Sequence, residues 1–402
     1  MHNLHSVPRL VWVALLGIGF SAGALGQRPA PHPSIYEIPL ASWHPFGIET
    51  TGDGNWVFVA LTGRFGDGGI AVIHRQGMVF ALDRVVPLPQ AASGLALTHD
   101  EKLLIATAGS QVYFLDVGGV STSGDSGSFA LEGSISDDAN AGSVCASVTA
   151  DDRWLFVCDE GTGQVTVIDL NRARSSGFTA SSIVGTIPVG LALTDTVVSR
   201  DGVWAYTTVE AVSSALGRKD ECIQEGQTAD QTPINPQGAV VVFNVAAAAS
   251  NPGAAVTQFV PAGCSPVRLS LSPDGLTLYV TARNNNEVLA LDTAKFASDP
   301  MNAVLGKAPV GAAPVPVAWI DLGAMVVVGN SNRFLELGVP QSLDVLDAAK
   351  LRAGVGAAAL VRTIPAGAFP RTLTLSPDGE TLFLSNYDSN SVQVMEVARL
   401  GV

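Results

Sequence analysis

Charged residues are scarce in this sequence of 402 residues, and positive charge is scarcer than negative charge. Asp, Glu, Lys and Arg make up 14% of the chain, and 36 acidic residues against 22 basic ones give a formal net charge of −14. An acidic surface that is poor in lysine repels polyanions. The composition therefore argues against partners such as nucleic acid or anionic membranes.

Histidine is also rare, and residues 27–402 contain no common catalytic motif. The six histidines form no His-x-x-x-His or His-Glu pair, which disfavours a transition-metal enzyme. Neither Gly-x-Ser-x-Gly, a phosphate-cradling Gly loop nor a Cys-x-x-Cys-His haem site occurs in that range. We therefore expect no bound metal, no cofactor, and no strong hydrolase or redox activity.

Long apolar runs are missing except near the N-terminus. Arg9 precedes an apolar run at 10–20, and Ala24-Leu25-Gly26 has the form of a signal-peptidase site. The run is short for a membrane span, so we expect residues 1–26 to be a cleaved signal peptide, with an uncleaved anchor helix as the alternative. Residues 27–402 would then form the mature protein, secreted to the periplasm or the extracellular space, with no membrane span.

What the sequence does contain is a repeat built around Ser-Pro-Asp-Gly. Two near copies occupy residues 264–293 and 369–397. Each consists of three short alternating segments joined by Asp-Gly or Asn-rich turns, which is typical of hairpins because these residues tolerate positive φ. One such unit cannot bury its apolar face alone, so the copies must stack against one another.

Weaker copies follow the same template and bring the total to seven. Their second strands are expected at 56–59, 103–105, 154–157, 204–207 and 325–328. A fourth strand follows each copy except the last, and residues 34–40 have the same form as those fourth strands. We therefore expect an all-β, seven-bladed β-propeller of four-stranded blades, closed by an N-terminal strand, 35–40, that pairs with 391–397.

The two clear copies resemble the YVTN-type β-propeller repeat. The resemblance is carried by Leu271-Ser272-Pro273-Asp274-Gly275 with the strand at 278–282, and by Leu375-Ser376-Pro377-Asp378-Gly379 with the strand at 382–386. It implies a relation to lactonase-like and quinoprotein amine dehydrogenase-like seven-bladed propellers. The recurring part is turn and core chemistry, so the resemblance specifies an architecture and leaves the activity open.

Four cysteines lie in the expected mature chain, and an even number in a secreted protein predicts disulfides. Cys145 and Cys158 lie at equal offsets from the Asp151-Asp152 turn, so a hairpin would place them opposite each other. Cys222 falls in a long insertion and Cys264 begins the fifth copy. We expect Cys145–Cys158 and Cys222–Cys264 bonds, the second holding the insertion over the ring, and a metal site is the alternative.

Candidate functional residues are those that the repeat does not require. In a propeller, the loops before the first strand and between the second and third strands share one face, around the mouth of the channel. Glu49, Asp195 and Arg268 lie in innermost strands, so they must face the channel or pair with each other. With the arginines of the looped face, the predicted ligand-binding residues are Glu49, Asp195, Arg268, Arg283, Arg333 and Arg371.

These features predict a secreted, non-catalytic, monomeric propeller that binds a small molecule, a glycan or a protein on its looped face. One alternative is a lactonase-like hydrolase that acts at the channel mouth through a carboxylate and arginines, with or without a divalent cation. Another is a scaffold of the cell envelope. The identity of the ligand is not encoded in any motif of the sequence.

Overall fold

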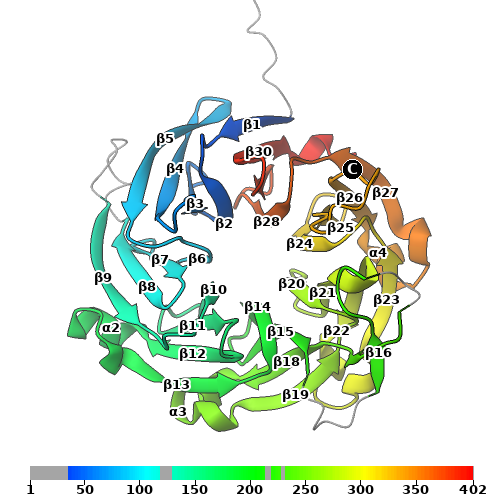
Figure 1. Ribbon diagram of the computed structural model, residues 1–402, viewed down its shortest axis with the longest axis horizontal. Helices are drawn as coiled ribbons and strands as arrows, with labels where there is room; N and C mark the ends of the chain where they lie inside the picture. The colour runs from blue at the N-terminus through cyan, green and yellow to red at the C-terminus, as the bar shows by residue number, and fades with distance from the viewer. Residues whose placement is uncertain (1–34, 118–128, 213–218, 228–230, 402) are drawn as a thin grey trace, which may run out of the picture. The chain divides into compact units, whose positions relative to one another are not determined.

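Each copy of the repeat folds into one four-stranded antiparallel sheet, or blade, and seven blades surround a central axis (Figure 1). The computed structural model describes residues 35–117, 129–212, 219–227 and 231–401. The expected all-β, seven-bladed propeller is confirmed. The expected signal peptide, residues 1–26, lies outside the described residues, and no helix in the described ranges is long and apolar enough to cross a membrane.

Blades 1 to 3 follow each other along the chain, each running from its innermost to its outermost strand. Blade 1 contains β2 (His44–Thr50), β3 (Trp56–Thr62), β4 (Gly68–Gln76) and β5 (Val79–Leu88). Blade 2 contains β6 (Leu95–Leu97), β7 (Leu103–Ala108), β8 (Gln111–Asp116) and β9 (Ala130–Ser136). Blade 3 contains β10 (Ser143–Val148), β11 (Trp154–Asp159), β12 (Gln164–Asp169) and β13 (Ile183–Pro188).

Blades 4 to 6 continue the same order. Blade 4 contains β14 (Leu191–Val198), β15 (Trp204–Ala211), β18 (Ala239–Asn244) and β19 (Val256–Pro261). Blade 5 contains β20 (Pro266–Leu271), β21 (Thr277–Ala282), β22 (Glu287–Asp292) and β23 (Val304–Pro309). Blade 6 contains β24 (Pro314–Ile320), β25 (Met325–Asn330), β26 (Ser342–Asp347) and β27 (Leu360–Pro365). Short helices α2 (Leu170–Ser176), α3 (Val245–Ser250) and α4 (Ala348–Arg352) precede the outermost strands of blades 3, 4 and 6.

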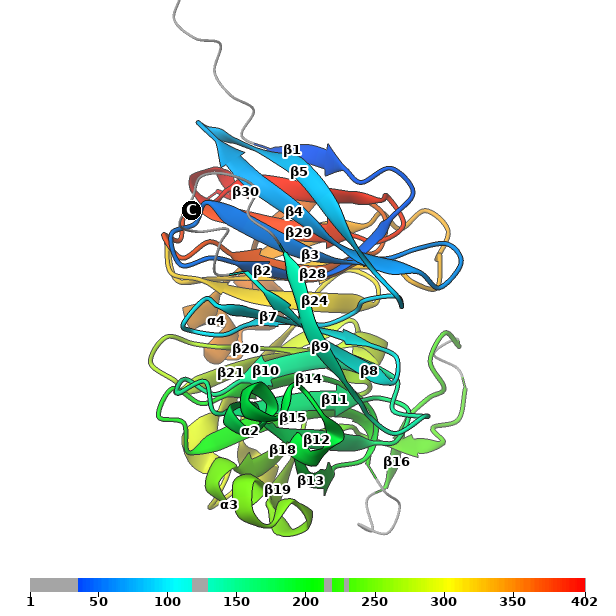
Figure 2. The ribbon, with the colours of Figure 1, turned by 90° about the vertical axis from the view of Figure 1, so that its left-hand side faces the viewer.

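Blade 7 closes the ring with strands from both ends of the chain. It contains β28 (Pro370–Leu375), β29 (Thr381–Asn386), β30 (Ser391–Glu396) and, as its outermost strand, β1 (Ile35–Pro39). β1 is antiparallel to β30, from Ile35 opposite Met395 to Pro39 opposite Ser391. Figures 1 and 2 show the two strands side by side at the edge of the ring. The predicted closure is thus confirmed.

The core is divided into seven apolar clusters, one at each junction between neighbouring blades. Between blades 7 and 1, for example, Ile38 and Phe383 pack against Ile48 and Val59. The other six junctions are built in the same way. Because both faces of every blade are apolar, each blade needs two neighbours, and only a closed ring provides them for all seven.

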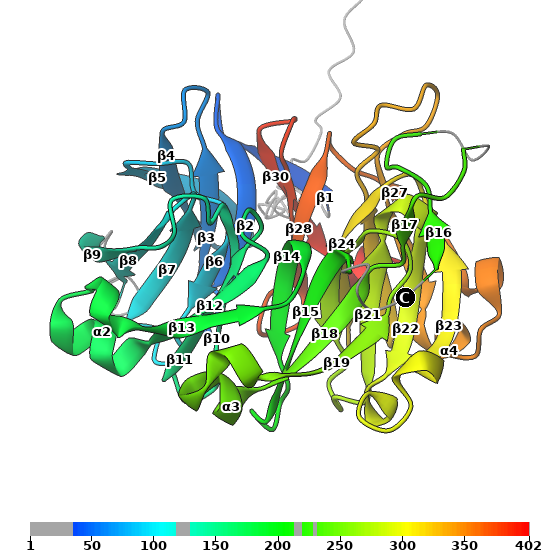
Figure 3. The same ribbon diagram turned by 60° about the horizontal axis from the view of Figure 1, so that its bottom comes forward.

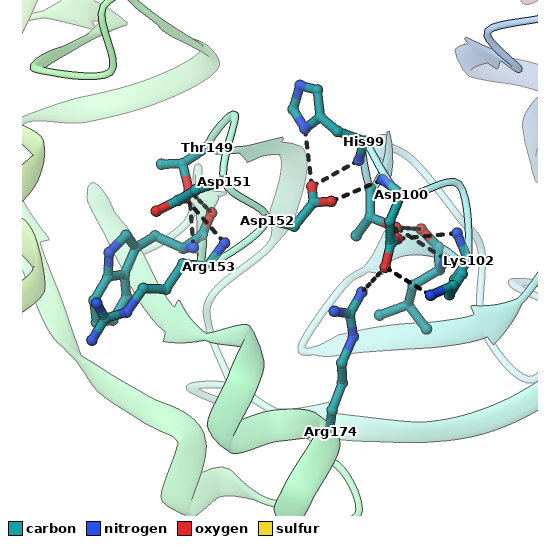
Figure 4. Close-up of polar contacts among 11 residues, drawn as sticks. His99, Asp100, Lys102, Thr149, Asp151, Asp152, Arg153 and Arg174 are labelled. Atoms are coloured by element: carbon teal, nitrogen blue, oxygen red, sulfur yellow. Dashed lines mark hydrogen bonds and ion pairs between the residues drawn. The ribbon is translucent and has the colours of Figure 1, made fainter.

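The turns between first and second strands lie opposite the looped face and link neighbouring blades. In blades 1 to 5 and 7 a Ser or Thr hydroxyl donates to the Asp two residues later. In blade 3, Asp152 replaces the glycine of the turn and adopts a φ of 54°. Figure 4 shows its carboxylate accepting hydrogen bonds from the backbone N–H groups of His99 and Asp100, at 2.7 and 2.8 Å, and contacting His99 Nδ1 at 2.9 Å. This acidic side chain therefore ties blade 3 to blade 2.

Both predicted disulfides are present. Cys145–Cys158 joins β10 to β11, and Cys222–Cys264 joins the insertion of blade 4 to the beginning of blade 5. The insertion contains a small hairpin of β16 (Asp220–Cys222) and β17 (Asn235–Pro236). Figures 1 and 3 show this hairpin above the outer part of blade 5, near β23, rather than above the channel. The disulfide therefore holds the insertion over blade 5, whereas the prediction placed the insertion over the ring as a whole.

Deleting residues 27–40 from the chain that lacks residues 1–26 tests closure. The deletion removes β1 and the buried side chains of Ile38 and Leu40, whose burial contributes on the order of 3–6 kcal/mol. We expect a clearly lower melting temperature in a circular dichroism melt. The exposed-site control Glu37→Ala should melt like the parent chain, and an unaltered melt of the deletion would contradict closure by β1.

Candidate functional site

A cavity of about 400 Å³ follows the axis of the ring and is lined by the innermost strands of all seven blades. Most positions at its wall carry small or apolar residues, such as Gly47, Gly94 and Thr372. Glu49, Asp195 and Arg268 are the charged Asp, Glu, Lys or Arg residues among its lining, and all three were singled out from the sequence. These charges therefore line the channel, which is one of the two arrangements expected from the sequence, and Asp195 and Arg268 also interact with each other.

Asp195 and Arg268 join blades 4 and 5 by exchanging hydrogen bonds with each other's strands. Asp195 Oδ2 accepts from the backbone N–H of Leu269 at 2.8 Å, and Arg268 Nη1 donates to the carbonyl oxygen of Thr194. Burial raises the pKa of Asp195, and the positive charge of Arg268 opposes that rise. The pair is thus partly structural, yet it leaves the guanidinium of Arg268 beside the cavity.

Glu49 differs from that pair, because no hydrogen bond or ion pair holds its carboxyl within the described part of the chain. Burial in the channel wall raises its pKa to about 8, so the group is mostly protonated at neutral pH. The equivalent wall position of blade 7 carries Thr374, which donates to the carbonyl of Ile48. Glu49 thus contributes no visible interaction to the fold and lies free to contact a ligand.

Arg283, in contrast, serves to hold the insertion in place. Its Nη2 donates to Glu210 Oε2 and to Glu225 Oε2, both at 2.7 Å, and its Nε donates to Glu225 Oε1. Asn284 Nδ2 adds a bond of 2.9 Å to the carbonyl of Ile223. Arg283 is buried, and two carboxylates match its charge. These contacts give this predicted ligand-binding residue a structural role.

Arg371 lies at the junction of blades 7 and 1, on the looped side of the cavity. Its Cζ lies 4.1 Å from the ring centre of Phe46, 4.9 Å from that of Phe369 and 5.9 Å from that of Tyr387. Its Nε is buried and has no hydrogen-bond partner, and no carboxylate in the described ranges lies within 4.0 Å of the guanidinium. Burial, followed by the positive charges of Arg268, Arg333 and Arg283, lowers the pKa of Arg371 to about 9.

Arg333 is exposed in the loop 331–341 and rests on its neighbour Phe334, with Cζ 5.5 Å from the ring centre. Its charge reaches Arg371, as does that of Arg268. We call Arg268, Arg333 and Arg371 the cationic mouth. In a chain of net charge −14, such a concentration of positive charge at one end of the channel favours anions there.

The sequence did not reveal the aromatic surroundings of Arg371. Phe46 comes from blade 1, whereas Phe369 and Tyr387 come from blade 7, and His44 stacks on Tyr387 at 4.8 Å between ring centres. The only local signal was that aromatic residues flank the start of the first strand in blades 1 and 7. Their convergence follows from ring closure, which no local pattern reports.

A second group of acids lies at the looped end of blade 3. The hydroxyl of Thr166 is 2.6 Å from Asp159 Oδ2 and 3.3 Å from Asp137 Oδ1, and Ser143 donates to Asp159 Oδ1. Burial and then the charge of Asp137 raise the pKa of Asp159 to about 7. Asn330 and Asn386 end the second strands of blades 6 and 7 at the same position, so the acid replaces a structural amide here.

Comparison with known families relates the second half of the chain to one group of propellers. Residues 237–400 match the family described as "Lactonase, 7-bladed beta-propeller". The matched range contains Arg268, Arg283, Arg333 and Arg371. The match covers less than half of the chain, and with the seven four-stranded blades it agrees with the expected resemblance to lactonase-like seven-bladed propellers. No curated protein matches the sequence.

Solved structures share the fold at low sequence identity. Hydrazine synthase of Kuenenia stuttgartiensis aligns with a TM-score of 0.63 and 17% identity, over 93% of this chain and 99% of that chain. A structure entitled "Crystal Structure of Mitotic Checkpoint Complex" aligns with a TM-score of 0.64 and 12% identity, over 97% of this chain and 99% of that chain. At such identities the similarity concerns the fold alone.

The raised pKa of the Glu49 carboxyl should make stability depend on pH. Because its pKa is raised in the folded state, folding takes up a proton between the unfolded pKa near 4.5 and the folded pKa of about 8. The free energy of unfolding should therefore fall as pH rises through this window. Glu49→Gln cannot titrate, so we expect it to lose less stability than wild type from pH ~5 to pH ~8.5, by on the order of 1–3 kcal/mol.

Urea unfolding at both pH values measures this difference, with the exposed-site variant Glu37→Gln as the control. The control should follow wild type at both values. Equal losses for Glu49→Gln and wild type would show that Glu49 is ionised in the folded channel.

Proposed function

We propose that this propeller binds a small anionic molecule at the cationic mouth and does not transform it. The ligand would carry a carboxylate or phosphate group that contacts Arg371 and Arg268. As a secreted protein, the chain would meet such a ligand in the periplasm or outside the cell. Two disulfides in the described residues are compatible with that location.

The observation that carries the proposal is the state of Arg371. Arg371 is half-buried, and its Nε is shielded from water without a hydrogen-bond partner. A guanidinium in this state with no carboxylate beside it is costly, and aromatic rings compensate for only part of that cost. An anion with two oxygens would supply both the missing charge and a partner for the planar N–H groups. Phe46 borders both Arg371 and the cavity, so the bound anion would lie at the entrance to the channel.

The acidic residues of the channel wall would limit how far an anionic group can enter the channel. Asp195 lies beside Arg268, and Glu49 lies in the next blade after Arg371 around the ring. Protonated Glu49 would donate a hydrogen bond to the ligand, whereas ionised Glu49 would repel an anion. Binding should therefore weaken as the pH rises above about 8, the pKa of Glu49.

A lactonase-like hydrolase is the second candidate function. It is favoured by the family match, whose range includes all three arginines of the cationic mouth. In this case the arginines would hold the carbonyl or carboxylate oxygens of a lactone, and protonated Glu49 would act as an acid. Turnover of a panel of lactones, measured with and without a chelator, separates this function from simple binding.

Substitution of Arg371 tests the binding proposal. We expect Arg371→Gln to weaken the binding of short mono- and dicarboxylates and of inorganic phosphate by at least tenfold in isothermal titration calorimetry, since the loss of one charge-assisted contact costs about 1.5–3 kcal/mol. Arg200→Gln, at an exposed position on the opposite face, serves as the control and should bind like wild type. Equal affinities for wild type and Arg371→Gln would contradict the proposal.

A further inference from the structure

Three large apolar side chains project from the looped face of blade 6. The loop 331–341, between β25 and β26, carries Phe334, Leu335 and Leu337, which are 39%, 72% and 100% exposed. We call these three residues the apolar ridge. Single exposed apolar residues are common, but three within four positions of one loop form a surface that requires an explanation.

The loop holds these side chains outward in a defined conformation. Asn332 is buried, and its Nδ2 donates to the carbonyls of Glu336 and Val339 at 3.2 and 2.9 Å, while its Oδ1 accepts from the N–H of Glu336 at 2.9 Å. Leu335 adopts a φ of 54°, which is unfavourable for a bulky residue. Leu335 is therefore held in a strained backbone conformation although its side chain is exposed.

The insertion of blade 4 supports the ridge from the side. A Cβ at Gly226 would lie 3.0 Å from Phe334 Cδ1, so glycine there allows the close approach of the two loops. The preceding residue, Glu225, is fixed by Arg283. Figure 3 shows the two loops standing beside each other above the looped face. The Cys222–Cys264 disulfide and the Arg283 contacts fix the insertion of blade 4, and the insertion in turn packs against Phe334 of the ridge.

The ridge is continuous with the cationic mouth. Arg333 precedes Phe334 in the chain and its guanidinium rests on that ring, while its charge acts on Arg371. A molecule that places an anionic group at the cationic mouth and extends past Arg333 would lie beside Phe334, the first residue of the ridge. Charge and apolar surface are thus arranged in the order that an amphiphilic anion requires.

We propose that the ligand of the cationic mouth is a free acyl-chain anion, such as a fatty carboxylate, whose head group contacts Arg371 and whose chain lies along the apolar ridge. This inference rests on the anion binding proposed above. A chain that covers an exposed ridge on one side buries about half of each methylene. We therefore expect affinity to rise by about twofold for each added methylene, until the chain outgrows the ridge.

A series of saturated carboxylates from butanoate to decanoate, kept below their micellar concentrations, tests the inference by calorimetry on the disulfide-bonded protein. Wild type should show the stepwise gain in affinity. The double variant Leu335→Ser/Leu337→Ser should bind butanoate like wild type but gain little with length. Leu276→Ser/Leu322→Ser, at exposed sites in turns on the opposite face, is the matched control and should behave like wild type.

The outcomes separate the two proposals. Binding of butanoate with no gain along the series would overturn the apolar ridge and leave anion binding intact. No binding of any carboxylate would overturn the ridge proposal, and if inorganic phosphate also failed to bind, anion binding would be refuted with it. Binding to phosphatidylglycerol vesicles without length-dependent binding of the free carboxylates would identify a membrane surface as the occupant and overturn a free ligand.

Discussion

Each blade of this protein is apolar on both faces, and the rest of the structure depends on that constraint. A sheet with two apolar faces is stable only between two neighbours, so the chain must form a ring. The seven clusters lie at the seven junctions, and β1 supplies the strand that blade 7 lacks. Ring closure creates the axial cavity, and it brings Phe46 of blade 1 against Arg371 of blade 7.

The charged residues near the axis differ in whether other residues of the fold neutralise or hydrogen-bond them. Arg283 is matched by Glu210 and Glu225, and Asp195 exchanges contacts with the neighbouring strand. Glu49 and Arg371 lack such partners among the described residues. The pKa of Glu49 is raised and that of Arg371 is lowered, so both shifts favour the neutral form of the side chain. Shielded ionisable groups without partners are costly unless a ligand restores the lost interactions, so these two residues are the candidates for ligand contact.

The asymmetry between the two faces follows from loop length. Turns opposite the looped face are short and are held by hydroxyl–carboxylate hydrogen bonds and by contacts such as Asp152 with His99. Connections on the looped face include the insertion of blade 4 and the loop 331–341 of blade 6. These longer segments are free of the repeat's requirements, so they can carry exposed apolar residues and support one another, as Phe334 and Gly226 do.

The sequence by itself determined the repeat, the number of blades, closure by residues 35–40 and both disulfides, because turn residues and strand alternation are local and recur in each copy. It also identified Glu49, Asp195 and Arg268 as charges at the axis, since small residues occupy that position in other copies. It could not distinguish Arg283 from Arg371. Which arginine meets carboxylates and which meets aromatic rings depends on residues from other blades, and only the closed ring brings those residues together.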